Sequence, residues 1–235
     1  MFQRISEPLK KQGETLGNKG KFLCVMKQTG FAVPDGVILD SKEYLDFLTQ
    51  NGIEAELQSL LESVTKENVK TVSKQITALF EGKRLDEKTR KRLLGEIEEN
   101  GYYAVRSSGL KEDLEEYSFA GQYQTFLNVQ GIDAIEKGII ACYQSMFSEV
   151  CLNYLVNNHI EVRELAMAVV VQRMVQAEYS GICFTVNPIT GKDKEMSIEV
   201  AVGLRLAKRR LIIAFQDFIS LLFQVVRRKL FALFS

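Results

Sequence analysis

Two positively charged side chains stand in settings that suit an anionic ligand. Arg106 follows an apolar, β-prone run, Tyr102–Val105, and Lys19 lies between glycines in Leu16–Lys21, where a run with helical spacing begins. A guanidinium at the end of a buried strand needs a counter-charge, and a phosphate can provide one. The free N–H groups at the start of a helix favour the same kind of ligand.

A structural role is the alternative for both cations. Arg106 could form a salt bridge with Glu112 or Asp113 in the acidic loop that follows it, since charged side chains are usually paired or solvated. Lys19 could be a solvated surface lysine, because its glycine spacing matches neither a Walker loop nor a dinucleotide-binding motif. The residues alone leave both interpretations open.

A glutamine interrupts a long apolar stretch. Ala166–Val175 has the continuous apolar character of a strand that is buried on both faces, and Gln172 lies inside it. A buried amide needs hydrogen-bond partners. Gln172 therefore either bonds to the backbone of the core or contacts a ligand.

A longer stretch around Arg106 resembles a known family. Residues 103–129, YAVRSSGLKEDLEEYSFAGQYQTFLNV, closely resemble the signature of a nucleotide-binding domain. Phosphoenolpyruvate synthases and pyruvate phosphate dikinases contain this domain, as does rifampicin phosphotransferase. Other segments that resemble the family lie around Lys19, around Gln172 and at Ser180–Gly191. The chain departs from the family pattern at Asn18, which replaces a glycine, and at Asn187, where an aspartate is common.

The resemblance implies an ATP site. In the family the matching lysine and arginine contact the phosphates of ATP, and the matching glutamine lies beside the adenine. The expected ATP-binding residues of this chain are Lys19, Arg106, Gly121, Thr125 and Gln172. The family transfers the β-phosphoryl group of ATP to a histidine on another domain, which implies ATP and Mg²⁺ as cofactors. We assign no catalytic residue and no metal ligand within the chain.

The phosphoryl acceptor is expected to lie elsewhere. The family's phosphohistidine belongs to a separate domain, and His159 lies in a polar, turn-like segment outside the family motifs. The expected partners are therefore ATP and a separate phosphohistidine or acceptor domain. We expect the isolated chain to be inactive. A rifampicin phosphotransferase-type ATP-binding domain and a non-catalytic nucleotide-binding remnant are the alternative functions.

The composition excludes several other classes of protein. The chain has 235 residues, 46% of them hydrophobic, which suffices for a globular core. Basic and acidic residues are equal at 30 each, so no global field favours nucleic acid. The polar N-terminus does not resemble a signal peptide. The cysteines lack metal-site spacing and are expected to be reduced core residues; they are Cys24, Cys142, Cys151 and Cys183. We expect a cytoplasmic protein without a nucleic-acid partner.

The expected fold class is α+β. The resemblance implies an ATP-grasp-like fold, a mixed or antiparallel sheet with helices packed on it, incomplete at the C-terminus. Residues 41–100 are expected to form a helical insert, with helices from Ser41 as N-cap, at 54–63, at 69–80, and from Asp86 as N-cap through Ile97. Two later helices are expected at 133–143 and 148–156, and late strands at 166–175, 180–184 and 196–204.

The resemblance ends at Leu204. Residues 205–210 are basic and 211–235 are rich in Phe, Leu, Ile and Val. We therefore expect a nucleotide-binding domain over residues 1–204 and a divergent tail over 205–235, explained by truncation or a frameshift. By itself, Leu211–Val226 has the polar face of an interfacial helix. It is interrupted by Asp217 and is short for a membrane span. We therefore expect a helix that packs on the sheet or a non-native tail, and no membrane binding.

Overall fold

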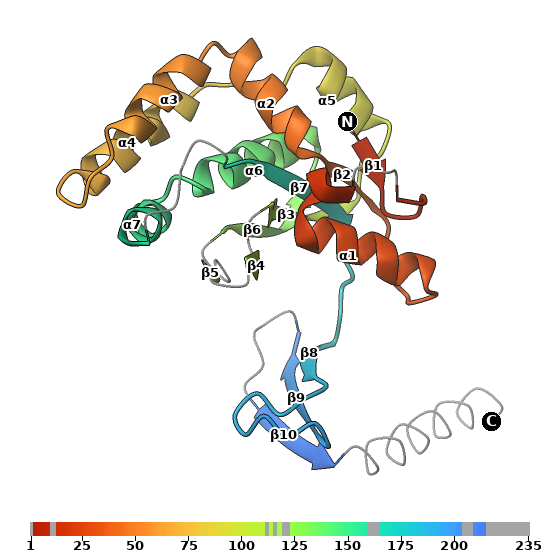
Figure 1. Ribbon diagram of the computed structural model, residues 1–235. Helices are drawn as coiled ribbons and strands as arrows, with labels where there is room; N and C mark the ends of the chain where they lie inside the picture. The colour runs from red at the N-terminus through yellow and green to blue at the C-terminus, as the bar shows by residue number, and fades with distance from the viewer. Residues whose placement is uncertain are drawn as a thin grey trace. The chain divides into compact units, whose positions relative to one another are not determined.

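Two units, each with its own sheet, make up the chain. The computed structural model describes residues 2–9, 13–110, 113–114, 117–118, 123–158, 165–203 and 209–214. The first unit is Met1–Met174 and the second is Val175–Ser235. Figure 1 shows the helices and strands of both.

The sheet of the first unit has five strands in the order β1-β2-β7-β3-β6, and every pairing between them is antiparallel. The strands are β1 (Phe2–Arg4), β2 (Gly36–Leu39), β3 (Tyr102–Gly109), β6 (Thr125–Gln130) and β7 (Met167–Arg173). A separate two-stranded hairpin consists of β4 (Asp113–Leu114) and β5 (Tyr117–Ser118). The central strand β7 is buried from Met167 to Gln172, which confirms the prediction from its apolar run.

A helical layer covers one face of this sheet (Figure 1). It consists of α2 (Ser41–Gln50), α3 (Glu54–Glu62), α4 (Val69–Phe80), α5 (Glu87–Leu94), α6 (Ile132–Ser145) and α7 (Glu149–Asn157). Helices α2 and α6 pack on the strands, and the others pack around them. The main core lies here, where Val105 and Val169 from the sheet meet Phe47, Ile139 and Tyr143 from the helices.

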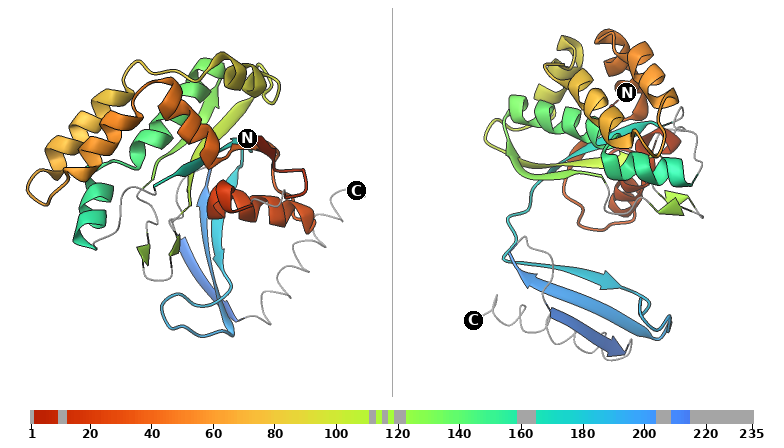
Figure 2. Two further views of the ribbon diagram at one scale, coloured as in Figure 1. Left: turned by 45° about the horizontal axis from the view of Figure 1, so that its top comes forward. Right: turned by 90° about the vertical axis from the view of Figure 1, so that its left-hand side faces the viewer.

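The short helix η1 (Gly13–Leu16) and helix α1 (Gly17–Gln28) pack on the opposite face of the sheet (Figure 2). A smaller apolar cluster lies beneath them, and it includes Leu16, Cys24, Ile38 and Val170. Because side chains alternate along a strand, Val169 of β7 faces the helical layer whereas Val170 faces α1. The sheet is therefore the middle layer of the first unit.

Most predicted helix limits are confirmed. Asp86 caps α5 as expected, through a bond from the amide of Thr89. Ser148, at the start of the predicted helix 148–156, caps α7 through a bond from the amide of Cys151. The N-cap of α2 is Asp40 and not Ser41, because the Asp40 carboxylate accepts bonds from two amides of the first turn while its backbone is extended. Helix α5 ends at Leu94, before the predicted limit.

The second unit has the strand order β10-β9-β8. Its strands are β8 (Tyr179–Phe184), β9 (Glu195–Val202) and β10 (Arg209–Ala214), and both pairings are antiparallel. The expectation of a helix from Leu211 is therefore wrong for residues 211–214, because pairing with β9 makes this β-branched run a strand. Residues 215–235 lie outside the described residues. Cys183 is exposed, contrary to the expectation of a core position, whereas the other three cysteines are buried.

Within the described part of the chain, the run Ile132–Asn157 is long and apolar enough to cross a membrane by length and composition. This run contains α6 and α7. Its side chains Ile135, Ile139 and Tyr143 are fully buried in the main core. Packing in the core therefore accounts for its apolar character.

Candidate functional site

One buried hydroxyl anchors the first turn of α1 to strand β3. Ser108 Oγ donates a hydrogen bond to the Leu16 carbonyl at 2.9 Å and accepts one from the Gly20 amide at 3.0 Å. Gly17 has a φ of +65°, and a Cβ there would lie 2.3 Å from the Ser108 carbonyl oxygen. A side chain does not fit at Gly17. The glycine-flanked Lys19 lies in this anchored turn.

Lys19 has an electrostatic effect on a buried thiol of α6. Burial raises the pKa of the Cys142 thiol to about 12, and the Lys19 ammonium opposes this shift. The Cys142 sulfur lies 3.8 Å from the carbonyl oxygen of Gln124, the residue before Thr125. This thiol therefore lies near the start of β6, where Thr125 lies.

Arg106 lies on the face of the sheet that α1 covers in part. Ser108, two residues further along β3, faces α1, and alternation along the strand gives Arg106 the same orientation. The Cα of Arg106 is paired with that of Thr125 in β6. Arg106 Nη1 donates to the side-chain oxygen of Gln172 at 3.4 Å.

Of the two roles that the sequence left open for Gln172, the structure describes a bond to the backbone, together with a contact to Arg106. Its side chain is 6% exposed, and its Nε2 donates to the Pro34 carbonyl at 3.1 Å while its oxygen accepts from Arg106. The amide is thus fixed by the backbone on one side and by a cation on the other. The alternative partners of Arg106, the side chains of Glu112 and Asp113, lie outside the described part of the chain.

The structure brings four of the five predicted residues to one face of the first unit. Arg106, Thr125 and Gln172 lie on neighbouring strands of the sheet, and Lys19 comes from the helix anchored beside them. Gly121 lies outside the described residues. Sequence analysis missed Ser108, although a hydroxyl in a buried strand must find a partner.

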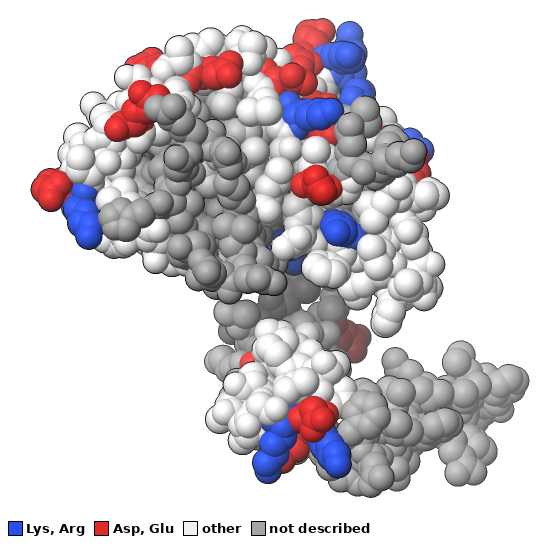
Figure 3. Space-filling view, viewed as in Figure 1, with Lys and Arg blue, Asp and Glu red and all other residues white. Residues whose placement is uncertain are grey.

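The four described candidates on this face are two cations, one amide and one hydroxyl. Among the residues that the structure describes, no three His, Cys, Asp or Glu side chains gather closely enough to hold a metal ion. Cations and amide dipoles of this kind can neutralise and orient an anion. On the molecular face drawn in Figure 3, acidic and basic side chains are interspersed over the described surface.

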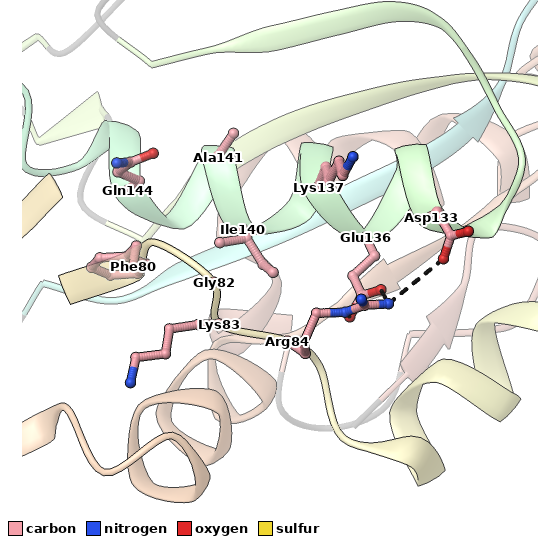
Figure 4. Close-up of a pocket in the computed structure, with 10 residues that line it drawn as sticks. All are labelled: Phe80, Gly82, Lys83, Arg84, Asp133, Glu136, Lys137, Ile140, Ala141 and Gln144. Atoms are coloured by element: carbon pink, nitrogen blue, oxygen red, sulfur yellow. Dashed lines mark hydrogen bonds and ion pairs between the residues drawn. The ribbon is translucent and has the colours of Figure 1, made fainter. Parts of the chain in front are cut away.

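A cavity of about 550 Å³ lies elsewhere in the first unit, between α6 and the loop that follows α4 (Figure 4). In Figure 4, Arg84 extends toward Glu136 and Asp133, whereas Lys83 points away from them. The carboxylate of Glu136 accepts bonds from Arg84 and from the Leu85 amide, so its charge is compensated within the fold. None of the predicted ATP-binding residues lines this cavity.

The fold is α+β and ATP-grasp-like, as predicted. Residues 13–207 match the family described as the pyruvate phosphate dikinase AMP/ATP-binding domain. The chain belongs to this family, which confirms the resemblance found in its motifs.

Similar proteins include a probable phosphoenolpyruvate synthase of Archaeoglobus fulgidus, 34% identical over 80% of this chain and 26% of the relative. The probable phosphoenolpyruvate synthase of Methanothermobacter thermautotrophicus is 34% identical over 80% of this chain and 29% of its own length. The rifampicin phosphotransferase of Bacillus subtilis is 34% identical over 85% of this chain and 24% of its own length. The chain spans about a quarter of the length of these curated relatives.

Proposed function

We propose that this chain binds ATP as the nucleotide-binding domain of a phosphotransferase of the phosphoenolpyruvate synthase type. The observation that carries the proposal is a connection between the two elements that carry Lys19 and Arg106. Lys19 lies in the first turn of α1, Arg106 in β3, and Ser108 joins these two elements. Two fixed cations beside a helix N-terminus provide the charge that a polyphosphate requires.

In this proposal each residue has a distinct role. Lys19 and Arg106 bind the phosphates, Gly121 and Thr125 line the nucleotide site, and Gln172 lies near the base. Phosphoryl transfer depends mainly on positioning and on neutralising the charge of the phosphates, which these residue types can provide. The pairing of Arg106 with Thr125 supports a shared site.

Mg²⁺ is proposed to bind together with ATP. Mg²⁺ prefers oxygen ligands and is usually held by carboxylates together with substrate phosphates. The four predicted residues that the structure describes are a lysine, an arginine, a threonine and a glutamine, which do not form a magnesium site by themselves. The phosphates of ATP would supply the ligands on this side of the ion.

The final acceptor is proposed to belong to a separate phosphohistidine or acceptor domain. Transfer to pyruvate and transfer to an antibiotic hydroxyl are both compatible with the relatives, because the two classes reach the same identity of 34%. We further propose that the domain extends to residue 204, which agrees with a family match that ends at 207. A cytoplasmic location is proposed from the four free cysteines.

Calorimetric titration with Mg-ATP tests the proposed site. Replacing Arg106 by alanine removes a charge-assisted contact, so the Kd for ATP should rise at least about tenfold. The matched control is Arg173→Ala, because Arg173 is 58% exposed, follows Gln172 in β7 and pairs with Glu98. The control should bind ATP as the unaltered chain does. Equal binding by Arg106→Ala would remove Arg106 from the site, and failure of the unaltered chain to bind ATP would overturn the proposed function.

A further inference from the structure

We propose that Ser108 is a positioning residue for the nucleotide phosphates, because its hydroxyl sets the place of Lys19 relative to Arg106. The inference rests on the proposed function and adds a residue to it. Ser108 would not contact ATP. It would act through the turn that carries Lys19.

The Ser108 hydroxyl bridges two backbone groups at the start of α1. In an α-helix that begins at Gly17, the Gly20 amide and the Leu16 carbonyl would form the first hydrogen bond with each other. Ser108 Oγ bonds to both groups, at 3.0 Å and 2.9 Å. A side chain from a strand 88 residues away thus takes part in the first turn of α1.

Backbone packing strengthens the same contact. The left-handed conformation of Gly17, with φ +65°, brings the turn so close that a Cβ would lie 2.4 Å from Ser108 Oγ. The serine is fully buried, so water cannot replace its two hydrogen bonds. Lys19 comes two residues after Gly17, and Arg106 comes two residues before Ser108. Both cations are therefore held close to one fixed point.

Removal of the Ser108 hydroxyl should therefore affect the binding of phosphate groups and not the binding of the base. Without the hydroxyl, the first turn of α1 can shift on β3, and Lys19 shifts with it. Gln172 is fixed separately by the Pro34 carbonyl, so the proposed contact with the base should not change. Loss of the Ser108 hydroxyl should lower the affinity for ligands that bear phosphates and leave the affinity for adenosine unchanged.

Titrations with ATP and with adenosine test this inference. In Ser108→Ala the Kd for ATP should rise about three- to tenfold, the usual contribution of one hydrogen bond, while the Kd for adenosine stays unchanged. The matched control is Ser73→Ala. Ser73 is also a buried serine, and its hydroxyl donates to the distant Phe147 carbonyl at 2.8 Å in the helical layer. The control should leave both dissociation constants unchanged.

A double-mutant cycle with Lys19→Ala separates positioning from general destabilisation. If Ser108 acts through Lys19, Ser108→Ala should cause no further loss of ATP affinity once Lys19 is absent. Additive losses would overturn the inference. If Ser108→Ala fails to fold, Ser108→Cys, which keeps a similar volume and a weaker donor, takes its place and should give an intermediate Kd.

Hydrogen exchange tests the anchor without any nucleotide. The Gly20 amide should exchange at least about tenfold faster in Ser108→Ala, while the Val170 amide in the central strand stays protected. Unchanged exchange at Gly20 would overturn the anchor itself. If the unaltered chain binds no ATP, the proposed function fails and this role fails with it. If the unaltered chain and Ser108→Ala bind ATP equally well, only the role of Ser108 fails.

Discussion

Asn187 shows at the scale of one residue why this chain departs from its family. Its side-chain oxygen accepts from the amides of Ile189 and Thr190, at 2.9 Å and 3.2 Å, and shapes the turn after β8. Its Nδ2 donates to Oε2 of Glu195 at 2.6 Å. An aspartate could accept the same two bonds, but it would face Glu195 with a second negative charge. The amide therefore suits this chain because Glu195 is its neighbour.

Asn187→Asp should change how the stability of the second unit depends on pH. Lys192 first, and then Asn187, lower the pKa of Glu195 in the unaltered chain, so this carboxylate stabilises the fold above its ordinary pKa and less as the pH falls. In the variant, repulsion between two carboxylates raises the pKa of the pair. The resulting loss of stability should be present at pH 7 and diminish as protonation removes one charge.

Thermal unfolding at pH 7 and at pH 4 measures this effect. The variant should have a lower Tm than the unaltered chain at pH 7 and a smaller difference at pH 4. Adding Glu195→Gln to Asn187→Asp removes the repulsion and should restore part of the Tm at pH 7. A loss of equal size at both pH values would show that the effect is steric and not electrostatic.

At the scale of elements, one carboxylate joins α6 to α5 and to the loop before it. Glu136 in α6 has a side chain that is 2% exposed. It accepts from Arg84 at 3.1 Å and 2.9 Å, from the Leu85 amide at 2.9 Å, and from Arg90. Helix α6 also packs on β3, the strand that carries Arg106. The outer helices are thus tied to the layer that supports the candidate site.

Glu136→Gln should destabilise the first unit by about 2 kcal/mol. Breaking a buried ion pair costs roughly 3–5 kcal/mol, and the cost is lower here because Arg84 is 65% exposed and stays solvated. Glu87→Gln is the control, since Glu87 forms an exposed pair with Lys91 at 3.5 Å and such pairs contribute little. Urea unfolding measures both variants. Equal midpoints for Glu136→Gln and the unaltered chain would contradict a structural role for the buried carboxylate.

Local sequence patterns predict helices and caps, but they do not predict which distant segments contact each other. The helix at 69–80 follows from periodicity, and the cap Asp86 follows from a side chain that bonds to a nearby amide. The bridge from Ser108 to α1 joins residues 88 positions apart, and local spacing says nothing about which segments meet. The run 211–214 is apolar enough for a helix or a strand, and only its pairing with β9 decides between them.

At the scale of the whole molecule, the first unit contains the two main apolar clusters and four of the predicted ATP-binding residues. The clusters contain residues from Phe2 to Val171, and none of the described residues of the second unit belongs to them. Lys19, Arg106, Thr125 and Gln172 lie within the same limits. Strand β7 completes the sheet near the end of this unit, since it pairs with both β2 and β3. The first unit should therefore fold by burial of its own core.

A fragment of residues 1–174 should fold independently of the rest of the chain. It keeps β7, whose buried residues occupy the centre of the sheet, and it should unfold cooperatively in urea with a free energy of several kcal/mol, as single domains do. A fragment of residues 1–166 is the control, because without β7 the strands β2 and β3 have no common partner. The shorter fragment should show no cooperative transition and no dispersed amide signals by NMR. If the longer fragment also stayed unfolded while the full chain folded, the second unit would be required for the fold of the first.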